Sequence, residues 1–156
     1  LERRGILTID NKSGEHVVKG DFKVPNEHYP NGRLTKGGHS KSSFDECEKM
    51  GLGNVVEGEY SNGVKWGSIP TSATKTKRNG GHTWFPDSWD DDKIVTEMYK
   101  VKNGKAKFVA NKLNDKGKIL GGVYNCDGVA IVYRQDMSGE SFYPEKDQSR
   151  YVEGVE

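Results

Sequence analysis

The second half of the chain alternates short apolar runs with polar turns. The runs are KAKFVA, KILGGVYN, VAIVYR and ESFYP, and the turns between them are NDKG, CDG and DMSG. Short runs rich in β-branched and aromatic residues, bounded by Gly, Asn and Asp, are typical of strands joined by tight turns. The pattern therefore predicts an antiparallel meander that ends near Pro144.

A first helix is predicted in the middle of the first half. Ser43 and Glu46 have the spacing of a capping box, in which the two side chains satisfy main-chain N–H groups at a helix start. Phe44 and Cys47, three residues apart, would share its buried face, and Gly51 would end it.

A second helix is predicted between Ser88, as its cap, and Gly104. Its apolar residues recur at helical spacing, namely Ile94, Val95, Met98 and Tyr99. A stripe of this kind is typical of a helix that packs against a core, so we expect these residues to be structural.

The remaining apolar segments of the first half predict strands. ILTID (6–10) and HVVKGDF (16–22) have strand composition, and a loop rich in Pro and Gly follows them. VVEGEYS and VKWGSI flank Asn62-Gly63, a strong signal for a hairpin. Together the elements predict an α+β fold with two groups of antiparallel strands and about two helices, in a single domain over residues 1–156.

Charge gives only local support for nucleic-acid binding. The formal net charge is +1, so RNA affinity would have to come from patches. One patch without acids lies in a Ser- and Thr-rich segment that we expect to be a mobile loop, and its cations are Lys65, Lys75, Lys77 and Arg78. This segment is either a phosphate contact or an ordinary solvated loop, and the acids at 90–92 would offset part of its field.

Cysteines and hydropathy exclude several classes of protein. Cys47 and Cys126 form no disulfide framework and no Cys/His cluster has zinc spacing, so both are predicted to be buried hydrophobes. No apolar stretch reaches membrane-spanning length, and the start, LERRGILTID, lacks the apolar region of a signal peptide. We therefore expect a soluble chain, with a charged tail after Pro144 that frays.

His16 and His39 are the residues with the clearest chemical potential. Both lie in glycine-bearing segments, and a histidine pKa near 6.5 lets one ring accept a proton while another donates one near neutral pH. Cleavage of RNA by its own 2′-hydroxyl needs a group that accepts a proton and a group that donates one. It also needs hydrogen-bond donors that stabilise the charged phosphorane. Gly37 and Gly38, which lack Cβ atoms, would let main-chain N–H groups approach a phosphate beside His39.

The order of motifs along the chain resembles the EndoU-type endoribonucleases, including the coronavirus uridylate-specific enzyme. EHVVKGDF (15–22) followed by LTKGGHS (34–40) resembles the two-histidine signature of that family. TWFP (83–86) before DSWDDDKI (87–94), and GESFYP (139–144) near the end, resemble the patterns of the bacterial members. The resemblance implies an EndoU-like nuclease fold with a central cleft, in which His16 and His39 are the catalytic pair.

The third catalytic position departs from the viral and animal pattern, which has a lysine there. The corresponding GGHTWFP has none, so Thr83 is the predicted phosphate contact and His82 the alternative. Because successive strand residues face opposite ways, only one of the two should point into the site. A hydroxyl carries no charge, so either Lys36 or a basic residue upstream would neutralise the phosphorane.

The resemblance further implies that Tyr143 contacts the base and ribose, although this residue is equally well explained as a structural strand aromatic. By family analogy, His39 is the base and His16 the acid.

The sequence thus predicts an endoribonuclease without a cofactor or metal, acting on single-stranded or loop RNA. Similarity to the C-terminal toxins of contact-dependent growth inhibition implies a delivered effector, cut from a larger secreted protein, that acts in the cytoplasm of a target cell. The resemblance leaves the RNA and its base preference open, with a tRNA as one candidate, and implies an immunity protein that covers the cleft as the protein partner.

Two other functions fit the same residues. A metal-dependent nuclease would use His39 beside an ion held by a carboxylate such as Asp21. A module that binds RNA or protein without cleaving it would need no proton chemistry. Cleavage in the presence of a chelator separates the three.

Overall fold

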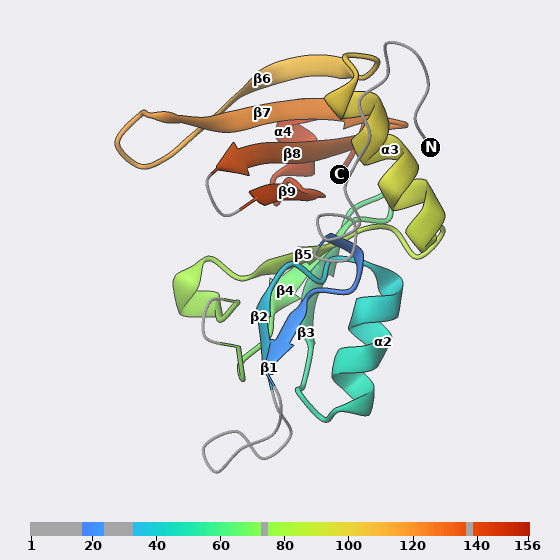
Figure 1. Cartoon of the computed structure of the whole chain (residues 1–156), viewed down its shortest axis with the longest axis vertical. Coiled ribbons are helices and arrows are strands. Elements are labelled where there is room, and N and C mark those ends of the chain that lie inside the picture. Colours follow the sequence, from blue (N-terminus) through green and yellow to red (C-terminus); the bar gives the residue numbers. More distant parts are fainter. Residues whose placement is uncertain (1–16, 24–32, 73–74, 137–138) are drawn as a thin grey trace.

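The computed structural model describes residues 17–23, 33–72, 75–136 and 139–156. Three antiparallel sheets occur within these residues (Figure 1). β1 (Asp21–Lys23) pairs with β2 (Arg33–Lys36). β3 (Val55–Glu59), β4 (Lys65–Ser68) and β5 (His82–Trp84) form a second sheet in that order.

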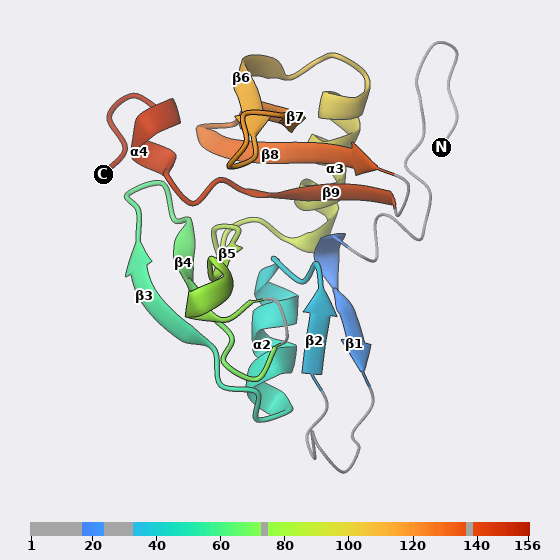
Figure 2. The same cartoon turned by 90° about the vertical axis from the view of Figure 1, so that its left-hand side faces the viewer.

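The third sheet is the meander predicted for the second half. It consists of β6 (Lys107–Leu113), β7 (Ile119–Cys126), β8 (Val129–Asp136) and β9 (Gly139–Pro144), each paired with the next. The α+β class with two main groups of antiparallel strands is therefore confirmed. β9 is the edge strand that faces β5 of the three-stranded sheet (Figure 2).

The first predicted helix is present but begins earlier than expected. α2 spans Lys41–Lys49, and its cap is Ser40, whose Oγ accepts the N–H of Ser43 at 3.0 Å. The capping-box assignment to Ser43 was wrong, because Ser43 lies inside the first turn and is buried. The helix ends as predicted, with Gly51 in the left-handed region at a φ of 74°.

The second predicted helix is also present, with its start moved by two residues. α3 spans Asp91–Lys102, and Asp90 rather than Ser88 caps it by accepting the N–H of Lys93 at 2.8 Å. The negative charge of an aspartate at this position also interacts favourably with the positive end of the helix dipole. The core assignment is confirmed for Ile94 and Met98, which are fully buried against the four-stranded sheet.

Three apolar clusters stabilise the molecule. The largest joins α3 to one face of the four-stranded sheet and includes Phe85 and Phe142. A second lies between α2 and the smaller sheets and includes Leu34 and Trp84. The third covers the other face of the four-stranded sheet beside α4 (Gln148–Tyr151).

The C-terminal tail is ordered, so the expectation that it frays was wrong. Gln148 is fully buried in this tail, and its amide bonds the main chain of Ala130 twice and the carbonyl of Glu145. Its Oε1 also accepts from the Asn62 side chain at the turn between β3 and β4. The tail therefore ties the two larger sheets together.

The first predicted strands are only partly present. Residues 6–10 lie outside the described residues, and Val17 and Val18 are helical rather than extended. Both valines are buried, and they join the cluster around α3, so tertiary packing overrides their β propensity here. The hairpin at Asn62-Gly63 is present as predicted, joining β3 to β4.

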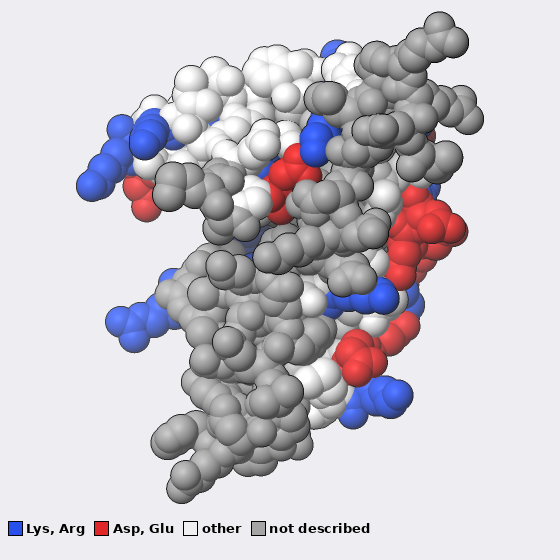
Figure 3. Space-filling model, viewed as in Figure 1, with Lys and Arg blue, Asp and Glu red and all other residues white. Residues whose placement is uncertain are grey.

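The basic segment is not a single open patch. Lys65 pairs with Asp87, and Lys77 pairs with Glu57 at 3.0 Å. Within the described part of this segment, a 3₁₀ turn η1 (Lys77–Asn79) and the bond from Ile69 N to Lys75 O give it a defined path. On the face shown in Figure 3, Lys and Arg side chains lie among Asp and Glu, and neither sign covers the surface.

Cys47 and Cys126 are buried and unpaired, as predicted. Burial raises the pKa of the Cys47 thiol to about 11, so it is protonated near neutral pH.

In the described part of the chain, no helix has the length and apolar character needed to cross a membrane.

Candidate active site

The short connection between β2 and α2 presents His39. Gly38 has a φ of 75°, and a Cβ built there would lie 2.6 Å from Ser43 Oγ and 3.0 Å from Leu34. Only glycine combines this backbone conformation with such close packing. The glycine before His39 is thus required by packing, in addition to any role toward a phosphate.

His39 is held by main-chain groups from two other segments. Its N–H donates to Val17 O at 3.4 Å, and its carbonyl accepts from Phe85 N at 2.8 Å. Its side chain is 6% exposed, and Nδ1 lies 2.7 Å from the carbonyl oxygen of Thr83. His39 is therefore positioned through its ring by β5 and through its main chain by Val17 and Phe85.

The contact with Thr83 sets the tautomer of His39. A carbonyl oxygen only accepts hydrogen bonds, so Nδ1 must carry the proton. The neutral ring then has its basic lone pair on Nε2. A carbonyl partner on one ring nitrogen is the usual way in which a protein fixes a histidine for proton transfer at the other.

His82 stacks against His39 from β5. The two ring centroids are 4.1 Å apart with an angle of 19° between the planes. His82 Nε2 donates to Gly38 O at 2.9 Å, and its Nδ1 is a buried atom without a partner. Burial, reinforced by the charge of Lys75, lowers the pKa of His82 to about 3, so this ring is neutral near neutral pH.

Thr83 and His82 contact different parts of the molecule, as strand alternation predicts. The Thr83 hydroxyl donates to Pro144 O on β9 at 2.8 Å, whereas His82 faces the connection that carries His39. The bond from Thr83 spans the two larger sheets, which lie side by side at β5 and β9 (Figure 2). Sequence reasoning missed Pro144 as a partner because a main-chain carbonyl leaves no mark in the sequence.

Tyr143 lies on β9, on the four-stranded side of the junction between β5 and β9. Its ring centroid is 5.3 Å from that of His39, with an angle of 22° between the planes. The same ring packs against the third apolar cluster. Tyr143 therefore has both a structural contact and a position beside His39.

Not every predicted site residue can be located. His16 lies outside the described residues, although its neighbour Val17 contacts His39 through the main chain. Lys36 is opposite Asp21 in the β1–β2 pair, but its side chain is outside the description. The structure thus brings together Gly38, His39, His82, Thr83 and Tyr143.

Lys75 is the cation of the basic segment that affects this region. Burial lowers its pKa, and its charge in turn lowers the pKa of His82. Among the described residues, Lys75 takes part in no ion pair, unlike Lys65 and Lys77. The sequence marked the basic segment but gave no reason to prefer Lys75 within it.

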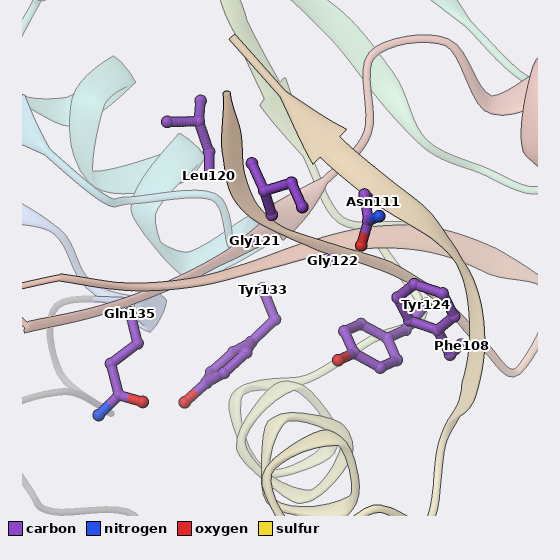
Figure 4. A pocket seen from close by; sticks show the side chains of 9 residues that line it. Phe108, Asn111, Leu120, Gly121, Gly122, Tyr124, Tyr133 and Gln135 are labelled. Carbon is purple, nitrogen blue, oxygen red and sulfur yellow. The ribbon is translucent and has the colours of Figure 1, made fainter. Parts of the chain in front are cut away.

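A separate hollow lies on the face of the four-stranded sheet against which α3 packs (Figure 4). It is about 370 Å³ in volume, and Phe108, Tyr124 and Tyr133 are among its walls. None of the predicted site residues lines it.

In the described part of the chain, His, Cys, Asp and Glu side chains form no group of three or more that could hold a metal ion.

Comparison with known protein families gives a match over most of the chain. The family described as bacterial EndoU nuclease matches residues 10–146, which is most of the chain and includes every predicted site residue. No curated protein and no solved structure matches the chain.

Proposed function

Because the chain belongs to the bacterial EndoU nuclease family, we propose that it is a metal-independent endoribonuclease acting on single-stranded or loop RNA. Membership of the family makes the chain a nuclease. The proposal adds the substrate and the reaction, which is attack of a ribose 2′-hydroxyl on the adjacent phosphorus. The products are a 2′,3′-cyclic phosphate and a 5′-hydroxyl.

The contact between His39 and Thr83 carries this proposal. With Nδ1 donating to the Thr83 carbonyl at 2.7 Å, Nε2 is the nitrogen of His39 that accepts the 2′-hydroxyl proton. The 2′-oxygen then bonds to phosphorus, and the bond from phosphorus to the 5′-oxygen breaks. The departing oxygen takes a proton from the acid, which we assign to His16.

The neighbourhood of Val17 supports the assignment of His16. The residue directly after His16 bonds the main chain of His39, and Ser40 Oγ donates to Val18 O. These contacts join the segments that carry the two histidines.

The remaining roles follow from the position of each residue. The Thr83 hydroxyl, which donates to Pro144 O, would turn its proton to a phosphate oxygen when RNA binds. Main-chain groups at Gly38 and the side chain of Lys36 would supply further donors to the phosphorane. Tyr143 would stack on a base, a contact worth about 1–3 kcal/mol in single-strand recognition.

The decisive test is the chemistry of the RNA ends formed in excess EDTA. We expect a cyclic phosphate and a 5′-hydroxyl from the native chain, and loss of cleavage in both His16→Ala and His39→Ala proteins that remain folded. Cleavage that requires added metal would favour the alternative with an ion near Asp21. Binding without any product would favour a non-catalytic module.

We further propose that the domain is an antibacterial toxin that acts in the cytoplasm of a target cell, with tRNA as a candidate substrate and an immunity protein covering the site. The similarity of bacterial family members to delivered C-terminal toxins supports this role. Expression in a bacterium should arrest growth, and the His39→Ala protein should not. Normal growth with active enzyme present would contradict the toxin role.

A further inference from the structure

We propose that His82 is a positioning residue: its ring holds Gly38 and His39 in place and exchanges no proton in the reaction. The inference rests on the proposed function in that His39 is taken as the base. Two contacts carry it, namely the bond from His82 Nε2 to Gly38 O at 2.9 Å and the stacking of the His82 and His39 rings at 4.1 Å.

Residues 82–85 act together on the connection that carries His39. The side chain of His82 binds the carbonyl of Gly38, and the carbonyl of Thr83 binds the side chain of His39. Phe85 N then donates to the carbonyl of His39 at 2.8 Å. Three residues of this segment thus bond Gly38 or His39, and His82 supplies the one contact to Gly38.

The residue at position 82 must satisfy two requirements at once. It needs a flat ring of imidazole size to stack on His39 while its edge meets Trp84, whose ring is 5.1 Å away at an angle of 77°. It also needs a donor at the far end of that ring for Gly38 O. Phenylalanine would keep the ring without the donor, and glutamine would keep a donor without the ring.

The surroundings of His82 argue against proton transfer by this residue in the reaction. Its Nε2 must carry a hydrogen because its partner is a carbonyl, and its Nδ1 is enclosed in a side chain that is only 4% exposed. Burial holds the ring neutral, as the low pKa shows. A ring in this state can orient a neighbour without competing for its proton.

The test compares His82→Phe and His82→Gln proteins with the native chain. Each variant keeps one of the two contacts, so we expect kcat for RNA cleavage to fall by about 10- to 100-fold in each, as a small misplacement of a catalytic group does. We expect KM to change little. In ¹⁵N-histidine NMR spectra, the ring signals of His39 should shift in both variants.

Two results would overturn the proposal. Loss of cleavage as complete as in the His39→Ala protein, with the His39 ring signals unchanged, would make His82 a proton carrier. Native kcat in both variants would show that His82 does not position His39. Thermal unfolding of both variants, beside an Ile94→Val protein with a mild core defect on α3, separates loss of stability from loss of positioning.

The NMR measurement does not depend on activity. If the native chain cleaves no RNA, the proposed function fails, and the His39 signals in the two variants still decide whether His82 sets the state of that ring.

Discussion

The carbonyl oxygen of Thr83 accepts the Nδ1 proton of His39 at 2.7 Å, while the Thr83 side chain points away and donates to β9. One residue therefore holds the proposed base through its main chain and joins two sheets through its hydroxyl. Substitution of the side chain leaves the carbonyl in place, which allows the two roles to be measured separately.

Replacement of Thr83 by valine should lower kcat by about 100-fold, since one donor to the phosphorane is lost. A Thr83→Ser protein keeps the hydroxyl and should retain most of the activity. Steady-state cleavage of a short RNA measures both. A Thr83→Val protein with native kcat would show that the hydroxyl serves only the bond to Pro144.

Replacement of Gly38 by alanine should destabilise the fold and reduce cleavage. The strained φ costs about 1–2 kcal/mol, and the clash with Ser43 and Leu34 adds about 1–3 kcal/mol. Gly128 is the matched control, because it has a similar φ of 81° and open space where a Cβ would be. Chemical denaturation should show a smaller loss for Gly128→Ala, and equal losses would mean that the packing around Gly38 is unimportant.

Replacement of Gln148 by alanine should cost about 3 kcal/mol of stability. The change leaves buried main-chain groups of Ala130 and Glu145 without partners. Gln135→Ala is the control, because that glutamine is exposed on β8. Its replacement should change the free energy of unfolding by less than about 0.5 kcal/mol. Urea unfolding curves compare the two, and similar midpoints would contradict a structural role for the C-terminal tail.

The stability of the native chain should fall as the pH is lowered through the window from about 6.5 to about 3. His82 is neutral in the fold, with a pKa of about 3, while in the unfolded chain it binds a proton below its ordinary value. The unfolded state therefore binds more protons in this window, and His82 contributes stability above it that is lost as acid is added. Unfolding free energies measured at several pH values should give a shallower slope for His82→Gln, by at most about 1.4 kcal/mol per pH unit. An unchanged slope would place the histidine in a more polar setting.

Much of the fold is present in the pattern of apolar residues. The meander, the hairpin at Asn62 and both longer helices follow from local spacing, because each is stabilised by contacts that repeat along the chain. The helix caps were misplaced because several residues of capping type precede each helix. In the structure Ser40 and Asp90 make the cap hydrogen bonds, and residue type alone does not distinguish them from the neighbouring serines and aspartates.

The site was less accessible to sequence reasoning. The motifs identified His39 and Thr83, but the contact between them uses a carbonyl oxygen, which every residue possesses. Likewise, the polar composition of the tail predicted fraying, whereas Gln148 is buried by bonds to residues far away in the chain. Long-range main-chain contacts of this kind are decided by the assembled fold.

The bond between Thr83 and Pro144 makes the docking of the two larger sheets and the setting of His39 parts of one equilibrium. A ligand that wedged the sheets apart at β5 and β9 would disable the enzyme without touching a nucleotide. Because the Thr83 hydroxyl is also a proposed phosphate contact, such a ligand would both remove the support of His39 and block RNA at the same junction.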